Sequence, residues 1–120
     1  MMSQGRLTVR ALETQIVSFE HATAGADHIL TVRGELDIYT APSFTAALKS
    51  ISGAERVIVD LRDCRYADGS AISALVRARK ESAVPIRLVV RNGSLVSRIL
   101  GLTKVDRLFA IFSSIEGAIG

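Results

Sequence analysis

The segment 65–71 holds the residues of this chain whose types and spacing are best suited to chemistry. An acidic residue, a glycine and a hydroxyl follow one another there as Asp68, Gly69 and Ser70. The flanking patterns predict a strand-to-helix turn, and in open α/β sheets ligands and partners bind at such turns. A phosphoryl group on the hydroxyl would gain hydrogen bonds from unpaired helix N–H groups and add a charge of about −1.5 to −2. The alternative is that Asp68 or Ser70 only caps the helix and Gly69 only relieves a tight turn.

A second strand-to-helix turn, at residues 34–42, carries Asp37 and the predicted helix cap Thr40. In a sheet of this order the two turns can lie side by side, and Asp37 and Asp68 would then form an acidic rim around the hydroxyl. Such carboxylates either orient Mg²⁺ or repel a phosphoryl group, and the sequence leaves both open. Because Asp37 lies outside any hydrophobic run, we expect it at an exposed turn, with a larger role in function than in folding.

The other reactive side chains form no catalytic or metal-binding pattern. His21 and His28 each lack a second histidine three or four positions away, which does not favour metal ligation. Cys64 is the single cysteine, so it forms no intramolecular disulfide, and we expect a small packed hydrophobic side chain. No G-x-G-x-x-G motif or P-loop lysine is present. We therefore expect no metal, no cofactor and no enzymatic activity, and a function in binding another protein.

Length and composition predict one globular domain. The 120 residues suffice for one core, and 48% hydrophobic against 22% charged residues is ordinary globular composition. No apolar run reaches the roughly 18 residues of a membrane span, and residues 1–14 lack the apolar stretch of a secretory signal. We therefore expect a cytoplasmic protein without membrane insertion. The net charge of +3 is spread along the chain without a basic block, which does not favour direct nucleic-acid binding.

Hydrophobic periodicity and turn signals predict alternating strands and helices. We expect two hairpin strands, then helices and strands in turn, at 16–23, 28–36, 40–53, 57–61, 70–81, 86–91, 94–100, 108–112 and from Ser113 onward. Ser113 and Glu116 form a capping box, and Gly101 lies just past its helix. The order ββαβαβαβα gives an α/β fold, a mixed sheet covered by helices, with a domain at 15–120 and a flexible tail at 1–14.

Several short motifs in a fixed order carry a family resemblance that spans about residues 15–119. They are Gly34-x-Leu36-Asp37-x-x-Thr40-Ala41-Pro42, the apolar strand Val57–Leu61 with its Asp-Leu end, the turn Asp68-Gly69-Ser70-Ala71, and the stretch Leu102–Phe109. With these motifs the chain resembles the STAS-domain family, and more narrowly the bacterial anti-sigma-factor antagonists. The resemblance implies a single STAS domain.

The resemblance also implies regulation of transcription by partner switching. The unmodified antagonist binds an anti-sigma factor, which is also a serine kinase, and so frees a sigma factor. The kinase phosphorylates the first serine of a D-S-S-G-like turn, which breaks the complex, and a phosphatase restores it. The matching partner-binding positions surround the two turns and the outward face of helix 70–81, and are Asp37, Tyr39, Thr40, Asp68, Gly69, Ser70, Ser73 and Arg77.

The sequence departs from the family at the phosphorylated position. Gly69 stands where the family has that serine, and Ala71 stands where it has glycine. Ser70 is the remaining candidate for phosphorylation, but one residue along a helix start turns the side chain by about 100°. We therefore expect no efficient phosphorylation. The alternative function is a non-switching STAS scaffold or regulatory subunit, for example of a lipid-transport ATPase; an enzyme or small-ligand carrier is third, and the oligomeric state stays open.

Overall fold

The computed structural model describes residues 4–12 and 15–119, with side chains from Val17 onward. Within these residues the chain forms one six-stranded sheet in the order β1-β2-β3-β4-β5-β6. Strands and helices follow one another as β1 (Gln4–Leu12), β2 (Gln15–Ala24), β3 (Asp27–Leu36), α1 (Ala41–Lys49), β4 (Arg56–Ala67), α2 (Gly69–Glu81), β5 (Ile86–Val89), α3 (Leu95–Leu102), the 3₁₀ helix η1 (Val105–Arg107), β6 (Ala110–Phe112) and α4 (Ile115–Ala118).

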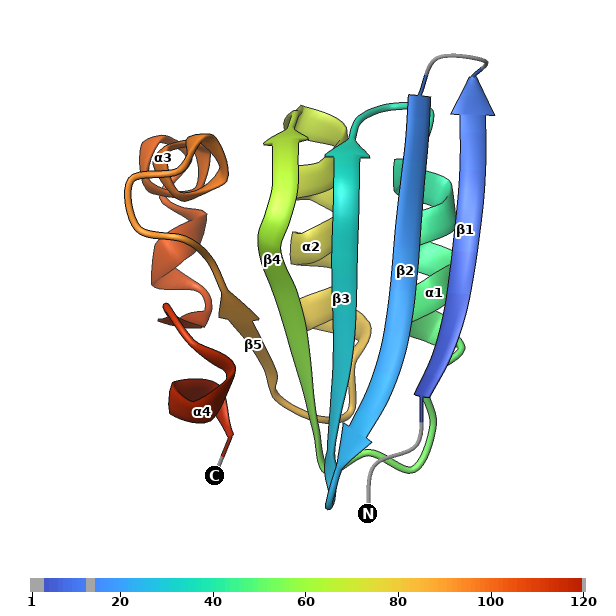
Figure 1. The fold of residues 1–120 in the computed structure, drawn as a ribbon. Helices are drawn as coiled ribbons and strands as arrows, with labels where there is room; N and C mark the ends of the chain where they lie inside the picture. The colour runs from blue at the N-terminus through green and yellow to red at the C-terminus, as the bar shows by residue number, and fades with distance from the viewer. Residues whose placement is uncertain (1–3, 13–14, 120) are drawn as a thin grey trace.

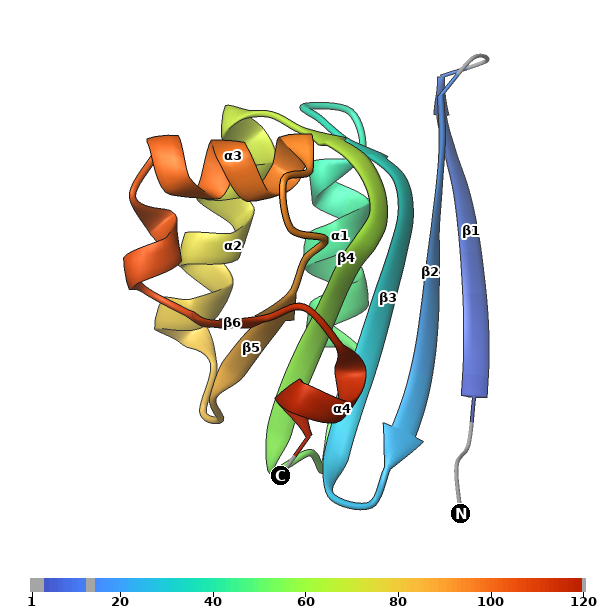
Figure 2. The ribbon, with the colours of Figure 1, turned by 60° about the vertical axis from the view of Figure 1, so that its left-hand side comes forward.

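The sheet is mixed. Strands β1, β2 and β3 pair antiparallel, and β3 to β6 pair parallel. Helices α1 and α2 cover one face of the sheet, and α4 lies against the other face (Figures 1 and 2). From β2 onward the predicted order ββαβαβαβα and the α/β class are confirmed.

The main core lies between the sheet and helices α1 to α3 and is mostly aliphatic. Alternate residues of β4, Val57, Val59 and Leu61, face this core. Ile58, between them, packs on the other face with Ala118 of α4. The strand is therefore buried on both faces, as its continuous apolar run predicts. Each such fully buried side chain contributes about 1.5–3 kcal/mol of stability.

The N-terminal strand differs from the sequence-based expectation. Residues 4–12, expected within a flexible tail, form β1 and pair with β2. The alternation Arg6, Leu7, Thr8, Val9, Arg10 has the period of two that strands require, although the two arginines weaken its apolar signal. The remaining tail positions, 1–3 and 13–14, lie outside the described residues.

Several element boundaries also differ. Helix α1 ends at Lys49, before the predicted end at Gly53, β5 ends at Val89 and β6 begins only at Ala110. Strand β4 continues to Ala67, well beyond the predicted end at Leu61, because its charged residues lie where the sheet faces solvent. Gly101 lies inside α3, which ends at Leu102. The terminal helix is capped by Ser114, whose hydroxyl accepts the Gly117 N–H at 3.0 Å, so the predicted capping box from Ser113 is wrong.

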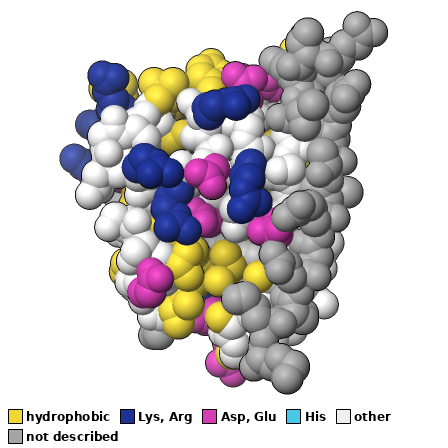
Figure 3. Space-filling model, in the orientation of Figure 1, with side chains coloured by type: hydrophobic (Ala, Val, Ile, Leu, Met, Phe, Trp, Pro, Cys, Tyr) yellow, Lys and Arg dark blue, Asp and Glu magenta, His cyan; other side chains and the backbone are white. Residues whose placement is uncertain are grey.

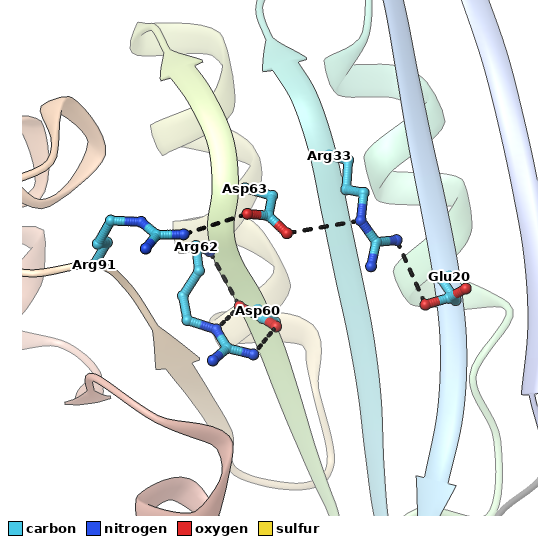
Figure 4. A network of polar contacts seen from close by, with 6 residues as sticks. All are labelled: Glu20, Arg33, Asp60, Arg62, Asp63 and Arg91. Carbon is cyan, nitrogen blue, oxygen red and sulfur yellow. Dashed lines mark hydrogen bonds and ion pairs between the residues drawn. The ribbon is translucent and has the colours of Figure 1, made fainter.

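The sheet face opposite α1 and α2 carries interleaved charges above the part covered by α4 (Figure 3). A chain of ion pairs crosses three strands, from Glu20 through Arg33 to Asp63 and on to Arg91 (Figure 4), with N–O distances of 3.4, 3.7 and 3.4 Å. Exposed pairs of this kind contribute about 0–1 kcal/mol each. Both signs alternate here, so this face presents no uniform potential to a charged partner.

Beside these ion pairs, Arg62 forms a two-pronged ion pair with the buried carboxylate of Asp60. Its Nε and one terminal nitrogen donate to the two carboxylate oxygens at 3.0 and 2.9 Å (Figure 4). The hydrogen bonds that Arg62 donates to Asp60 raise the pKa of Arg62. The buried acid is therefore paired, as a charge at the centre of a sheet must be.

Candidate partner-binding site

The two strand-to-helix turns lie side by side at one edge of the sheet, as the sequence predicts. Strands β3 and β4 are parallel, with Leu36 opposite Ala67. The Asp68 N–H donates to the Leu36 carbonyl at 3.1 Å and ties the turns together. Helices α1 and α2 both begin at this edge, at the upper end of Figure 1. We call the exposed surface of the two turns, together with that of α2 as far as Arg77, the motif edge; it includes Ile38, Tyr39, Tyr66, Gly69, Ser73 and Arg77.

The first turn is held by its own side chains. Asp37 Oδ1 accepts the backbone N–H groups of Tyr39 at 2.9 Å and Thr40 at 3.0 Å. The Thr40 hydroxyl accepts the Asp37 N–H at 2.8 Å and donates to the Glu35 carbonyl at 2.9 Å. This is the local bonding that favours Asp and Thr in turns.

The expectation that Asp37 is exposed is wrong. Asp37 is only 7% exposed, and Thr40 is fully buried. Asp37 is therefore no free carboxylate of an acidic rim, because its Oδ1 is occupied by the turn's own N–H groups. Thr40 is the N-cap residue of α1, as predicted, but its side chain makes no capping hydrogen bond, since its hydroxyl bonds to the backbone of Asp37 and Glu35.

The second turn opens outward. Asp68 caps α2, because its Oδ1 accepts the N–H groups of Ser70 at 2.9 Å and Ala71 at 3.2 Å. Gly69 is exposed, and a Cβ added to it would meet no atom within 4 Å. Ser70 is half-buried, and Ala71 is fully buried. Position 69 is therefore the outward-facing position of the turn, and position 70 is already turned partly away.

Large hydrophobic side chains in and beside these turns are exposed to solvent. Ile38 is 64% exposed, Tyr39 57% and Tyr66 40%. On α2, Ser73 and Arg77 are exposed one and two helical turns beyond Gly69. Sequence reasoning named Tyr39 but missed Ile38 and Tyr66; the signal was a large apolar residue inside an otherwise polar turn. Exposed aromatic side chains are enriched in protein interfaces.

Cys64 lies beneath the second turn and is inert. It is 5% exposed, and its thiol donates to the Tyr66 carbonyl at 3.2 Å. Burial raises its pKa to about 11. Since the thiolate is the reactive form, this is a packed side chain, as predicted.

The two histidines lie at the far end of the β2–β3 hairpin from the motif edge. His21 Nε2 and His28 Nδ1 are 2.9 Å apart and share a hydrogen bond. Burial, and then the proximity of His28, lower the pKa of His21. Across the described part of the chain, no three His, Cys, Asp or Glu side chains gather as a metal would require. Nor does any helix of the described residues have the length and apolar character to cross a bilayer.

Comparison with known proteins identifies the family of this chain. The model of the STAS domain matches residues 19–118, so the chain belongs to the STAS domain family. The anti-sigma-B factor antagonist of Listeria monocytogenes is 34% identical over 99 residues, which cover 80% of this chain and 78% of that protein.

Solved structures show the same fold. An anti-sigma factor antagonist from Mycobacterium paratuberculosis superposes with a TM-score of 0.78 at 18% identity, over 85% of this chain and 90% of that one. The anti-sigma factor antagonist SpoIIAA in its unphosphorylated form gives a TM-score of 0.57 at 17% identity, over 83% and 92%. At these identities the likeness concerns the fold.

Proposed function

We propose that this STAS domain is an anti-sigma factor antagonist, which binds an anti-sigma factor of the serine-kinase type and so releases a sigma factor. The observation that carries the proposal is the motif edge, where two turns joined backbone to backbone present exposed hydrophobic side chains beside a polar helix face. The name of the Listeria relative, which is similar over four-fifths of this chain, supports the same function. A cytoplasmic location follows from the proposed partner.

Tyr39 and Arg77 are the proposed anchors of the interface. Tyr39 offers a large exposed ring, and Arg77 an exposed cation two helical turns along α2. Tyrosine and arginine are among the residues that most often dominate binding energies. Asp37, Thr40 and Asp68 support binding indirectly in this proposal, because they hold the turns that display the anchors.

The binding test uses the anti-sigma factor kinases of the same organism and isothermal titration calorimetry. We expect nanomolar to micromolar binding, a loss of about tenfold or more for Tyr39→Ala, and a similar loss for Arg77→Glu, with the melting temperature nearly unchanged. The matched controls are Leu102→Ala, which removes another exposed hydrophobic side chain, and Arg98→Glu, which reverses another exposed charge. Equal effects of anchors and controls would contradict this surface. Capture of a membrane transport ATPase in place of a kinase would favour the regulatory-subunit alternative.

The phosphorylation switch is proposed to be absent. The outward position of the turn is Gly69, which has no hydroxyl, and Ser70 is half-buried. The protein would then stay in a permanently binding-competent form, and neither a kinase nor a phosphatase would change its state.

Mass spectrometry after incubation with ATP and a related antagonist kinase tests this. The wild-type mass should stay constant, and Gly69→Ser should gain one phosphate, because a side chain at position 69 meets open space. Adding Ser70→Ala to Gly69→Ser should leave that phosphate in place. Stoichiometric phosphate on Ser70 of the wild type, coupled to loss of partner binding, would overturn the proposal.

A further inference from the structure

A pocket of about 350 Å³ opens between the C-terminal halves of α1 and α2, at the opposite end of α2 from Gly69. Its walls are largely aliphatic. Leu48 of α1, Val57 of β4 and Ile86 of β5 line it, together with Ile51 and Val84 from the adjoining loops. This volume lies within the ~300–1,000 Å³ of small-molecule sites, which are likewise mostly apolar with a few polar groups.

Small residues keep the pocket open. Helix α2 contributes Ala74 and Ala78 to the lining, and the loops before β4 and β5 contribute Ala54 and Ala83. Protein interiors are otherwise packed with few voids larger than a water molecule. Replacing these methyl groups by larger side chains would fill the space, so the cavity depends directly on the sequence at these positions.

The mouth of the pocket carries an excess of positive charge. Lys49, Arg77 and Glu81 all line it. Lys49 Nζ lies 4.0 Å from Glu81 Oε2, a long contact between exposed side chains. Arg77 has no hydrogen bond or ion pair to any of the described residues, so its guanidinium is available at the edge of an apolar cavity. An apolar wall beside an unpaired cation is complementary to a ligand with an apolar body and an anionic head.

We propose that this pocket binds a small amphiphilic carboxylate, with the hydrocarbon chain among the aliphatic walls and the carboxylate at Arg77. Arg77 also belongs to the motif edge, so a bound carboxylate would engage a side chain that the protein partner needs. This second consequence, competition between ligand and partner, rests on the proposed function. Binding of the ligand itself does not.

Octanoate is the probe, titrated into the full chain and followed by amide and methyl NMR. We expect saturable shifts at pocket residues such as Ala78, Val84 and Ile86, and weaker binding of octylammonium, which has the same chain with the opposite charge. Arg77→Gln should lower octanoate affinity about two- to fivefold, the range for exposed ion pairs, and leave octanol binding unchanged. Absence of saturable shifts, or equal affinity for octanoate and octylammonium, would overturn the proposal.

Filling variants test the location. Ala78→Leu and Ala83→Leu enlarge two different walls and should each abolish octanoate binding, while Ala46→Leu, on the exposed side of α1, should not. Unchanged octanoate binding in both folded filling variants would refute this pocket. If octanoate and octylammonium both fail to bind, and Ala78→Leu weakens binding of the protein partner, then the pocket accepts a side chain of the partner and the small-ligand proposal fails. Tyr39→Ala should lower the affinity for the protein partner and leave the affinity for octanoate unchanged, so the two proposals can fail separately.

Discussion

The two strand-to-helix turns of the motif edge use the same residue types for different purposes. In the first turn Asp37 is followed three positions later by Thr40, and in the second Asp68 is followed two positions later by Ser70. Each turn leads into a helix of the same layer. In the first turn the aspartate and Thr40 are buried and bonded to one another's backbone. In the second, Asp68 is half-buried, Gly69 is exposed and the hydroxyl of Ser70 makes no bond to the described residues.

The difference shows that the residue types of a motif do not by themselves tell whether a residue stabilises its own turn or contacts another molecule. What separates them is whether the side-chain oxygen is already used by its own turn. The first turn is closed in this sense and holds Tyr39 in place. The second turn is open, because capping by Asp68 leaves the next position free to meet another molecule.

The largest effect that distinguishes the turns is expected for Asp37→Ala. Removing this carboxylate leaves the Tyr39 N–H without its acceptor and leaves the Thr40 N–H only its longer bond, to the Asp37 carbonyl at 3.2 Å. Hydrogen bonds to charged groups contribute about 1.5–3 kcal/mol. We expect the free energy of unfolding, measured in urea, to fall by about 3 kcal/mol, and by about 1 kcal/mol for Asp37→Asn, which keeps one acceptor oxygen. A variant of unchanged stability that no longer binds the partner would restore the direct functional role first expected for Asp37.

A smaller loss is expected for Asp68→Ala. This substitution removes only a helix cap, which typically contributes about 1 kcal/mol. Urea unfolding of both alanine variants side by side measures the difference between the turns. A loss at Asp68 as large as that at Asp37 would show that the second turn is as tightly closed as the first.

The alkylation rate of Cys64 measures local opening of the second turn in the folded protein. With a pKa of about 11, roughly one thiol in a thousand is ionised at pH 8, so alkylation by iodoacetamide should be far slower than in urea. Asp68→Ala should speed alkylation by up to about fivefold if the lost cap lets the end of β4 open. Gly69→Ser should leave the rate unchanged, which makes it the control. Rapid alkylation of the wild type would contradict a packed thiol.

The smallest effect on stability is expected for Gly69→Ser. The position is exposed, its added Cβ meets nothing within 4 Å, and serine is well tolerated at a helix start. The free energy of unfolding should change by no more than about 0.5 kcal/mol. A clear destabilisation would mean that glycine is retained for the backbone of the turn, with no bearing on phosphorylation.

Much of the fold follows from local patterns in the sequence. The period-two run in β3, the apolar stripe of α2 and the continuous apolar run in β4 each have one dominant physical reading, and parallel pairing of β3 and β4 then brings the turns together. Strand β1 was missed because an edge strand with two arginines carries a weak apolar signal.

The burial of Asp37 could not be predicted by the same means. Whether a turn aspartate faces solvent or its own backbone depends on the packing of Leu36 below it and on the neighbouring strand, and both are tertiary. The pocket between α1 and α2 likewise arises where alanines from three separate segments meet. No local window of sequence contains them together.

The bond between Leu36 and Asp68 also bears on the order of folding. It joins residues 32 positions apart, whereas the β2–β3 hairpin closes over Gly25 and Ala26 alone. Local hairpins form in about 1–10 μs, while distant parallel pairing must first pay the larger entropy of loop closure. We expect the hairpin to form first and the motif edge only after α1 has crossed over and β4 has docked. A nascent chain that has emerged only as far as β4 would therefore carry the first turn complete and still have no surface with which to bind its partner.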